Sequence, residues 1–353
     1  MKVLHLPYNV ANWTTIHVNT LNKIDGIKAK GLVFTEKHIF HDHDNLIYIS
    51  QKTWWQKYKS AFTFIRYVIW ADVIHWYWDD KIFPRNWALK FIRFMRKPCL
   101  VEWLGSEIRI PEIEFKDNDI FKLEFPNFSS VSAETQRLAS ISLQAIFSKY
   151  KVDVLLCPEM EQYIDRKFFP RNYSLRQRIE VTAFTAKSPQ LSKESTIRIV
   201  HIPSDQSVKG TSYITSIMEK LCAKYPKIDY QMISGVSHEQ AIEMIGESDI
   251  YLDQFILGSY GMAALEAMSL GKVVFCYIKD SIRNTYPDDM PIINASVFNL
   301  EEKLEFYINT PEQLNELGKA SRCYVEKYHN SAVLLSNLIS IYQKKISGET
   351  LLT

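Results

Sequence analysis

Short apolar runs alternate with amphipathic stretches along the whole chain. The runs at residues 3–7, 71–76, 99–103 and 152–157 have the length and the β-branched or aromatic content of buried strands. Helix-like segments precede the second and third of these runs. The alternation predicts βαβ units, in which helices cover a parallel sheet.

The second half of the chain repeats this alternation more clearly. Residues 211–224 predict an amphipathic helix, because Ile214, Ile217, Met218 and Leu221 fall on one stripe. The other predicted elements are strands at residues 197–202, 229–233, 250–255 and 272–278, and helices at residues 238–247, 262–270, 311–328 and 331–345.

A polar stretch lies between the two halves. Residues 185–195 contain Pro189 and few apolar side chains, which indicates a linker. The length of 353 residues favours two domains of roughly 150–190 residues over a single core. We therefore expect an N-terminal domain at residues 1–186, a C-terminal domain at residues 196–330 and a final segment at residues 331–353.

Charge and cysteine content exclude several classes of protein. There are 42 basic and 40 acidic residues, a net charge of +2, which argues against a dedicated nucleic-acid binder. The five cysteines are widely spaced and form no C-x-x-C pair, so neither a zinc site nor a disulfide framework is predicted. No signal peptide or membrane span is predicted, because the first apolar run ends at Pro7 and no run of about 18 apolar residues follows. We expect a cytoplasmic protein, either free or at the cytosolic face of a membrane.

The segment at residues 253–274 carries the clearest chemical signal. A strand leads through a loop containing Gly258 and Gly261 into a helix. Glycine lets the backbone approach a ligand closely, and the N–H groups at a helix start attract phosphate. Glu266 lies just over one turn into this helix, where its carboxylate can accept hydrogen bonds from two neighbouring sugar hydroxyls. The alternative is an ordinary glycine turn with a solvated glutamate.

A second strand-to-helix loop occupies residues 201–211. Lys209 is suited to binding a diphosphate and Ser204 can donate a hydrogen bond to it. The alternative for Lys209 is a solvated surface lysine. Together the two loops give as candidate donor-binding residues Ser204, Lys209, Gly210, Gly258, Ser259, Tyr260, Gly261, Met262 and Glu266.

These two loops together resemble the donor-binding half of the large retaining GT-B family of nucleotide-sugar glycosyltransferases. The resemblance rests on residues 209–211, 263–272 and 318–326 and covers roughly residues 197–342. It implies an α/β GT-B fold, with two Rossmann-like domains facing each other across a cleft. It also implies that the first domain binds the acceptor and the second the donor, and that the last helix packs back towards the first domain.

The family assigns roles to the matching residues. The glutamate matching Glu266 binds ribose, the lysine matching Lys209 binds the diphosphate, and the turn at residues 258–261 lies under the phosphates and the sugar. The family motif has two glutamates separated by seven residues, and the first of them falls on Gly258 here. Ser204 stands where arginine is common, and Leu104 where histidine is common. The resemblance is therefore to a divergent member.

The N-terminal half offers three further candidates. Asn12 follows the first strand and is a candidate for the donor phosphates, or else caps a helix. Glu107 and Arg109 follow a strand and a glycine, so we expect them at the edge of the cleft. Glu107 is a catalytic candidate and Arg109 an acceptor-binding one; the alternative is a surface ion pair.

Residues 85–97 carry five basic residues and no acidic one. On a helical wheel Lys90, Arg93 and Lys97 share the face opposite the apolar residues, and Trp54 with Trp55 lies nearby in the sequence. Such a helix can lie on an anionic membrane. The predicted contact covers residues 54–97; the alternative is a core helix with a solvated basic face.

The resemblance thus implies a retaining, hexosyltransferase-type glycosyltransferase that moves a sugar from a nucleotide-diphosphate donor, with a UDP-sugar expected. We expect the acceptor to be a saccharide or a lipid-linked acceptor of cell-surface polysaccharide or glycoconjugate synthesis. Glu266, Lys209 and Glu107 are the catalytic candidates. The resemblance implies metal-independent chemistry without a cofactor. The alternatives are a non-catalytic GT-B subunit and a sugar-nucleotide epimerase.

Overall fold

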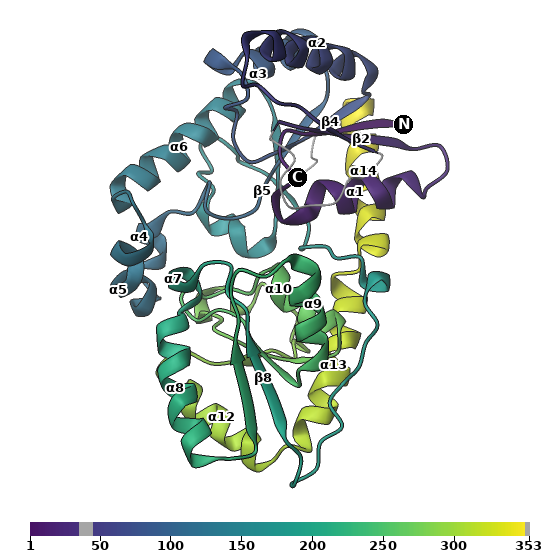
Figure 1. The fold of residues 1–353 in the computed structure, drawn as a ribbon. Helices are drawn as coiled ribbons and strands as arrows, with labels where there is room; N and C mark the ends of the chain where they lie inside the picture. Colours follow the sequence, from purple (N-terminus) through teal and green to yellow (C-terminus); the bar gives the residue numbers. More distant parts are fainter. Residues whose placement is uncertain (35–44, 350–353) are drawn as a thin grey trace. The chain divides into compact units, whose positions relative to one another are not determined.

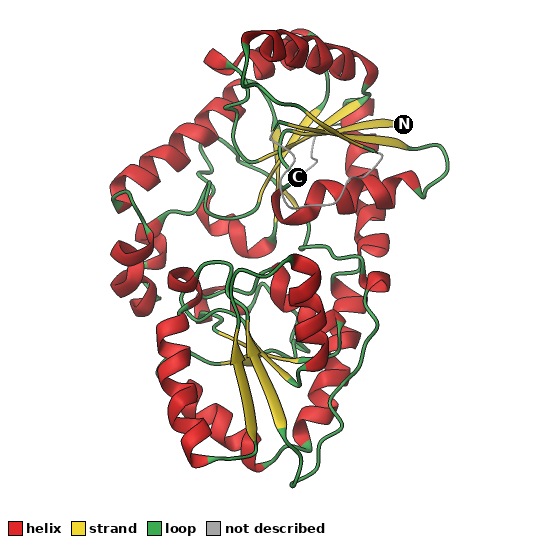
Figure 2. Ribbon diagram, in the orientation of Figure 1, coloured by secondary structure: helices red, strands yellow, loops and turns green. Residues whose placement is uncertain are grey.

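The computed structural model describes residues 1–34 and 45–349. The chain divides into two compact units, each built on its own parallel sheet (Figures 1 and 2). Unit 1 consists of Met1–Ile110, Ala133–Arg178 and Ser331–Thr353, and unit 2 consists of Pro111–Ser132 and Ile179–Asn330. The α/β class predicted from the sequence is confirmed.

The sheet of unit 1 has the strand order β3-β2-β1-β4-β5-β6-β7, and all its neighbours are parallel. The order reverses direction between β1 and β4, where ligands commonly bind at the carboxyl ends of the strands. The strands are β1 (Lys2–Leu6), β2 (Lys28–Val33), β3 (Leu46–Tyr48), β4 (Val73–Tyr77), β5 (Cys99–Trp103), β6 (Asp153–Leu156) and β7 (Tyr173–Ser174).

Helices cover both faces of this sheet. Successive side chains of each strand point to opposite faces, so the buried strands present apolar residues on both sides. On one face Val3 and Val73 share a core with Leu335 of α14 (Ser331–Ser347) and Val18 of α1 (Trp13–Asn22). On the other face Trp76 contacts Phe147 of α6 (Ala133–Lys149) through their rings. The last helix of the chain is therefore an integral part of unit 1.

Two helices of unit 1, α2 (Trp54–Trp70) and α3 (Trp87–Phe94), pack against each other through aromatic rings. The α2 helix begins with a capping box, in which Thr53 and Gln56 bond each other's backbone N–H groups. Its buried residue Phe64 contacts both Trp87 and Phe91 of α3.

The sheet of unit 2 has the order β12-β11-β10-β8-β9 and is also parallel. Its strands are β8 (Ile197–His201), β9 (Ile228–Met232), β10 (Ile250–Leu252), β11 (Val273–Cys276) and β12 (Ile293–Asn294). Its helices are α4 (Pro111–Glu114), α5 (Asp119–Phe128), α7 (Gln206–Lys209), α8 (Thr211–Lys224), α9 (His238–Glu247), α10 (Met262–Ser269), α11 (Asp280–Arg283), α12 (Leu300–Asn309) and α13 (Gln313–Tyr328). Short 3-10 helices occur in both units: η1 (Val10–Asn12), η2 (Pro84–Asn86) and η3 (Pro158–Tyr163) belong to unit 1, and η4 (Val181–Ala183) belongs to unit 2.

The stretch expected to link the domains, residues 185–195, lies against unit 2. Its backbone groups bond that unit: Lys187 N–H donates to the Leu270 carbonyl, and Leu191 N–H donates to the Asn315 side chain. The chain instead passes between the units after Ile110, Ser132, Arg178 and Asn330, and Ile179 pairs with Asn330 beside the last two crossings. The polar sequence of this stretch predicted a linker, but its backbone hydrogen bonds attach it to unit 2.

None of the helices in the described parts of the chain combines the length and the apolar character needed to cross a bilayer.

Two helical glycines offer a test of the packing in unit 2. A Cβ on Gly318 of α13 would lie 2.5 Å from Pro189 Cδ and 2.6 Å from the Gly271 carbonyl oxygen, whereas a Cβ on Gly246 of α9 would meet nothing closer than 3.9 Å. Gly318→Ala should therefore destabilise the protein by about 1–3 kcal/mol through overpacking. Gly246→Ala should stabilise it by about 0.5–1 kcal/mol, as alanine normally does in a helix. Urea unfolding measures both, and changes of the same sign would contradict this packing.

Candidate functional site

The loop after β8 is fixed by a buried histidine. His201 donates from Nδ1 to the Leu252 carbonyl at 2.8 Å, and its Nε2 accepts from the Thr211 hydroxyl at 2.9 Å. Burial lowers the pKa of His201 to about 4, so the ring is neutral at pH 7. The histidine thereby ties the ends of β8 and β10 to the start of α8.

The loop itself continues into the short helix α7. The Asp205 carboxylate caps α7 by accepting from the N–H groups of Ser207 and Val208. Lys209 ends the helix, and Gly210 follows in the left-handed region with φ +77°. Ser204, the predicted hydrogen-bond donor, is exposed before this turn.

Asp253 connects this loop to the one after β10. Its carboxylate is fully buried, and Lys209 Nζ lies 2.5 Å from Oδ1. The N–H of Gly261 lies 3.5 Å from Oδ2. Lys209 is thus a largely buried, paired cation, which its polar sequence neighbourhood did not indicate, and sequence reasoning missed Asp253 altogether.

The glycine loop at residues 254–261 is held by its own side chains and by Lys279. Gln254 donates from its side chain to the Ser259 carbonyl, and Lys279 N–H donates to the Gly258 carbonyl at 3.0 Å. The Tyr260 side chain lies in the core, with its hydroxyl 3.0 Å from His329 Nε2. A ligand above the loop would therefore meet the backbone of Tyr260 rather than its ring.

Glu266 stands on α10, which begins with Met262 directly after Gly261. Its side chain is 16% exposed, and one oxygen lies 2.7 Å from Nε2 of His238, the first residue of α9. The hydrogen bond to Glu266 raises the pKa of His238 above its usual value. Sequence reasoning missed His238, because the residue lies 28 positions from Glu266 in another helix.

In unit 1 the carboxylate of Glu107 accepts from the N–H groups of Leu104 and Gly105. Burial raises the pKa of Glu107 to about 7, so both protonation states are populated near neutral pH. Arg109 lies two residues further on and lowers the pKa of Glu107, which opposes the larger effect of burial. The two predicted residues are therefore electrostatically coupled.

Glu107 also lines a cavity of about 340 Å³ beside α6. Trp78, at the end of β4, takes part in the wall with φ +68°, a left-handed conformation that is rare for a bulky residue and is often found at functional sites. The lining residues are Trp78, Asp79, Asp80, Lys81, Ser106, Glu107, Gln136, Ala139, Ser142, Leu143 and Ile146.

Asn12 lies in the turn before α1. It adopts φ +65°, and its side-chain oxygen lies 3.4 Å from the Asn9 amide nitrogen. Asn12 makes no side-chain hydrogen bond to the first turn of α1. Asn12, Glu107 and Arg109 belong to unit 1, whereas the structure brings the other predicted residues together in unit 2.

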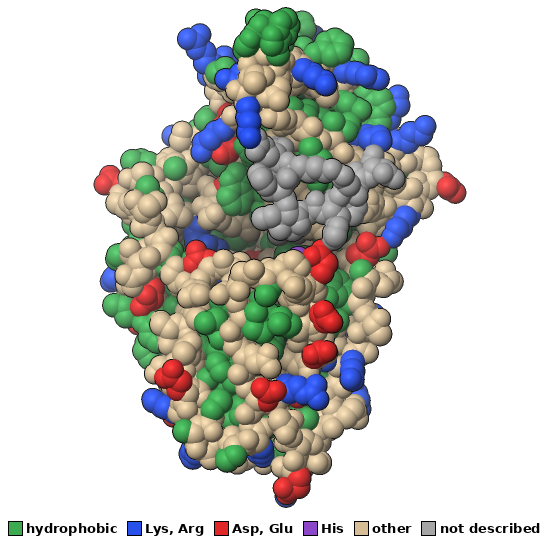
Figure 3. Space-filling model, viewed as in Figure 1, with side chains coloured by type: hydrophobic (Ala, Val, Ile, Leu, Met, Phe, Trp, Pro, Cys, Tyr) green, Lys and Arg blue, Asp and Glu red, His purple; other side chains and the backbone are tan. Residues whose placement is uncertain are grey.

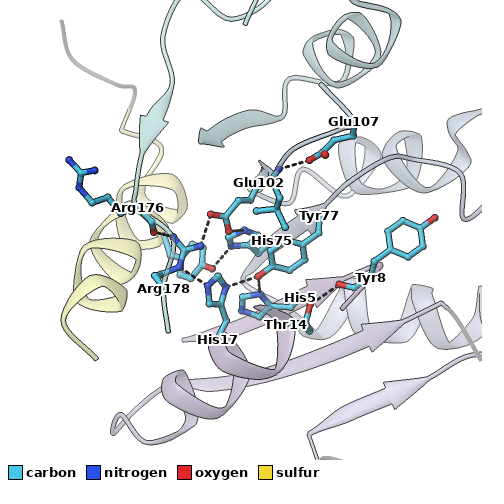
Figure 4. A network of polar contacts seen from close by, with 12 residues as sticks. His5, Tyr8, Thr14, His17, His75, Tyr77, Glu102, Glu107, Arg176 and Arg178 are labelled. Carbon is cyan, nitrogen blue, oxygen red and sulfur yellow. Dashed lines mark hydrogen bonds and ion pairs between the residues drawn. The ribbon is translucent and has the colours of Figure 1, made fainter. Parts of the chain in front are cut away.

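A polar network fills the core of unit 1 beneath α1 and α14, and sequence reasoning did not detect it (Figure 4). Arg178 can only donate, so the atom it meets at 2.7 Å, His17 Nε2, is an acceptor. His17 Nδ1–H then donates to the Tyr77 hydroxyl, which donates to Nδ1 of His5. Burial lowers the pKa of all three histidines, His5, His17 and His75, and keeps them neutral.

The other branch of the network runs through Glu102. Arg178 Nη2 lies 2.5 Å from one carboxylate oxygen of Glu102, and His75 Nε2 lies 3.0 Å from the other. The proton of His75 therefore sits on Nε2, and its Nδ1 accepts from the Tyr342 hydroxyl at 2.6 Å. Arg178 thus determines the proton positions of the first branch, and the Glu102 carboxylate determines those of the second.

The ring nitrogens of His5, His17 and His75 lie within 4.8 Å of one another, a spacing that suggests a metal site. A metal needs unoccupied nitrogen lone pairs, whereas the hydrogen bonds assigned above already use the acceptor nitrogen of each ring. The adjacent cation, Arg178, would also repel a metal ion. The cluster is better explained as a polar core.

Comparisons with known proteins support the architecture. No protein-family model matches the sequence, and no curated protein matches it. Sucrose-phosphate synthase of Thermosynechococcus elongatus is similar in structure, with a TM-score of 0.63 and 11% identity over 98% of this chain and 99% of that one. Anabaena HepE in complex with UDP-glucose has a TM-score of 0.63 and 12% identity over 98% of this chain and all of that one.

An alpha-glucosyltransferase in complex with UDP has a TM-score of 0.65 and 10% identity, covering 98% of this chain and 100% of that one. The chain has the GT-B fold. At these identities the similarity establishes the architecture, and the GT-B fold places both glycine-containing loops of unit 2 at the carboxyl ends of its strands.

The Lys209–Asp253 pair predicts a specific pattern of stability. Lys209→Met leaves a buried carboxylate without its counter-charge, so it should lower the free energy of unfolding by about 3–5 kcal/mol. The double variant Lys209→Met/Asp253→Leu removes both charges and should recover a large part of that loss. Chemical denaturation of the two variants measures the difference. Equal stability of the single and double variants would show that the pair is not formed.

Proposed function

We propose that the protein is a glycosyltransferase that moves a sugar from a UDP-sugar to a saccharide or a lipid-linked acceptor. The observation that carries the proposal is the assembly around Asp253, which joins Lys209 to the glycine loop, followed by Glu266 on the next helix. Proteins of the same fold support the nucleotide, since HepE and the alpha-glucosyltransferase are described in complex with UDP or UDP-glucose.

In this proposal the residues of unit 2 stabilise the leaving diphosphate. The anomeric carbon gains positive charge as the diphosphate departs, so the barrier falls when cations and N–H groups meet the developing negative charge. Lys209 and the amides at residues 258–261 are suited to this role, with Ser204 as a further donor. Glu266 would bind the ribose hydroxyls. Retention of configuration and metal independence are proposed on the resemblance alone.

The cavity beside Glu107 is the proposed acceptor site. Its carboxylates, Asp79, Asp80 and Glu107, can accept hydrogen bonds from several hydroxyl groups, and Trp78 offers an apolar ring. This combination suits a saccharide. Glu107, with a pKa of about 7, is matched to exchanging a proton with an acceptor hydroxyl near neutral pH, and Arg109 would modulate its charge.

A thermal-shift screen and calorimetric titration with UDP and UDP-sugars test the donor site. Glu266→Gln should weaken UDP binding by about tenfold or more, since hydrogen bonds to a charged group are worth about 1.5–3 kcal/mol. Glu243→Gln, an exposed change on α9, is the matched control and should bind like the wild type.

Wild-type affinity in Glu266→Gln would remove this residue from the donor site. A wild-type protein that binds neither UDP nor any UDP-sugar would contradict the proposed function. Conversion of a UDP-sugar in the absence of acceptor would favour the epimerase, and binding of a UDP-sugar without turnover would favour the non-catalytic subunit.

We also propose that the enzyme works at the cytosolic face of a membrane. Helix α2 carries apolar residues on two sides: Phe64 and Val68 are buried, while a stripe on the other side is between 54% and 69% exposed. That exposed stripe consists of Trp54, Trp55, Tyr58, Phe62 and Ile69, and Phe94 of α3 is 80% exposed. Large exposed apolar patches mark interaction surfaces.

Basic side chains surround this apolar stripe, as the blue and green side chains over α2 and α3 in Figure 3 illustrate. The exposed basic residues on α2, on α3 and directly after α3 are Lys57, Lys59, Arg66, Lys90, Arg93 and Arg96. Lys97, expected on the basic face, instead donates to the Ala71 carbonyl at 2.6 Å. Aromatic residues beside cations fit an anionic lipid surface, because the rings pack against its apolar region and the cations bind its anionic headgroups.

Liposome co-sedimentation tests this contact. The wild type should bind anionic vesicles at low salt, and the triple variant Lys59→Glu/Arg66→Glu/Arg93→Glu should bind at least about a hundredfold more weakly, at about 1 kcal/mol per basic residue. The triple variant Lys220→Glu/Lys224→Glu/Lys319→Glu, on exposed lysines of unit 2, changes the net charge by the same amount and should bind like the wild type. Protein that stays in the supernatant with anionic vesicles at low salt would exclude the membrane contact.

A further inference from the structure

The segment Pro111–Ser132 belongs to unit 2, although it lies between β5 and α6 of unit 1 in the sequence. It contains the helices α4 and α5 and contacts α7. Tyr213 of α8 donates to Glu124 of this segment at 2.5 Å. The segment is therefore anchored to the part of unit 2 that carries the two glycine-containing loops.

Asn118 connects this segment directly to the glycine loop. It is 1% exposed. Its Oδ1 accepts from Phe121 N–H at 3.0 Å and so caps α5, while its Nδ2 donates to the Ile256 carbonyl at 2.7 Å. The oxygen of this buried side-chain amide thus caps a helix, and its nitrogen fixes the loop.

Lys279 holds the same loop from a second direction. Its backbone N–H donates to the Gly258 carbonyl at 3.0 Å. Its ammonium group lies 3.0 Å from Glu114 and 3.3 Å from Asp117, and its side chain is 1% exposed. The inserted segment therefore supplies the charges that keep Lys279 in place.

Gly258 lies between these two residues. Its φ is +73°, and a Cβ built on it would lie 3.2 Å from Asn118 Nδ2 and 3.2 Å from Lys279 Cβ and Cγ. A larger residue at position 258 would face both backbone strain and contact with Asn118 and Lys279. The space that a side chain at this position would take is already occupied by the inserted segment and its partner lysine.

We propose that the segment Pro111–Ser132 is a clamp that fixes the glycine loop for nucleotide-sugar binding, with Asn118 and Lys279 as positioning residues. The proposal rests on the proposed function of the loop. Neither residue needs to touch the donor. Each restricts the carbonyl groups of Ile256 and Gly258, so the neighbouring N–H groups are held in one arrangement before the ligand arrives, which lowers the entropic cost of binding.

The test compares two variants of the same segment. Asn118→Asp keeps the oxygen that caps α5 but replaces the donor to Ile256 with an acceptor. Lys122→Ala, the matched control, changes an exposed side chain of α5 and leaves the bonds of Asn118 and Glu124 in place. Hydrogen–deuterium exchange of the amides at residues 253–262 and calorimetric UDP titration are measured on the full-length protein, and thermal unfolding reports overall stability.

Asn118→Asp should raise loop exchange and weaken UDP binding by about tenfold each, the effect expected when one buried hydrogen bond is lost. Lys122→Ala should leave both within about twofold of the wild type. Wild-type exchange and UDP affinity in Asn118→Asp would overturn the clamp, and so would equal loosening of the loop in both variants. If Asn118→Asp loosens the loop but UDP fails to bind the wild type, the clamp stands and the donor role of the loop is overturned.

Discussion

The arrangement of loops in the proposed donor site depends on the counter-charge that the buried Asp253 carboxylate requires. An ionised group in a protein interior requires a counter-charge and hydrogen bonds, and Asp253 obtains the charge from Lys209, 44 residues earlier in the chain. The pair forms only if α7 ends beside the loop that follows β10. One electrostatic requirement therefore brings the two glycine-containing loops together, and His201 supports the same junction from the ends of β8 and β10.

Unit 1 also buries charged and polar groups, and it stabilises them with a larger hydrogen-bond network. Its sheet carries histidines, a tyrosine and a glutamate on the face beneath α1 and α14. Arg178 orders the protons of the branch through His17, and Glu102 orders the proton of His75. The Nε2–H of His5 ends one branch and has no partner among the described residues. Because Tyr342 completes the other branch, the last helix contributes hydrogen bonds as well as apolar surface to this core.

Periodicity predicted the elements well, because strand and helix patterns depend on neighbours in the sequence. The helix expected at residues 211–224 has the same bounds in the structure, whereas the strand expected at residues 250–255 ends at Leu252, where Asp253 turns to meet Lys209. Residue contacts across long separations were not predictable. Lys209 was predicted as a diphosphate ligand or a solvated lysine, and neither interpretation included its ion pair with Asp253. Nothing local indicated that Asn118 would lie against Gly258.

The path of the chain limits how such a protein can change in evolution. It leaves one unit for the other after Ile110, Ser132, Arg178 and Asn330. A recombination event that exchanged residues 179–330 alone would import a foreign glycine loop but keep the resident helices α4 and α5, which have to fit against it. Substitutions around Gly258 are therefore tied to those in a segment more than a hundred residues earlier, and residues 179–330 are not an interchangeable module.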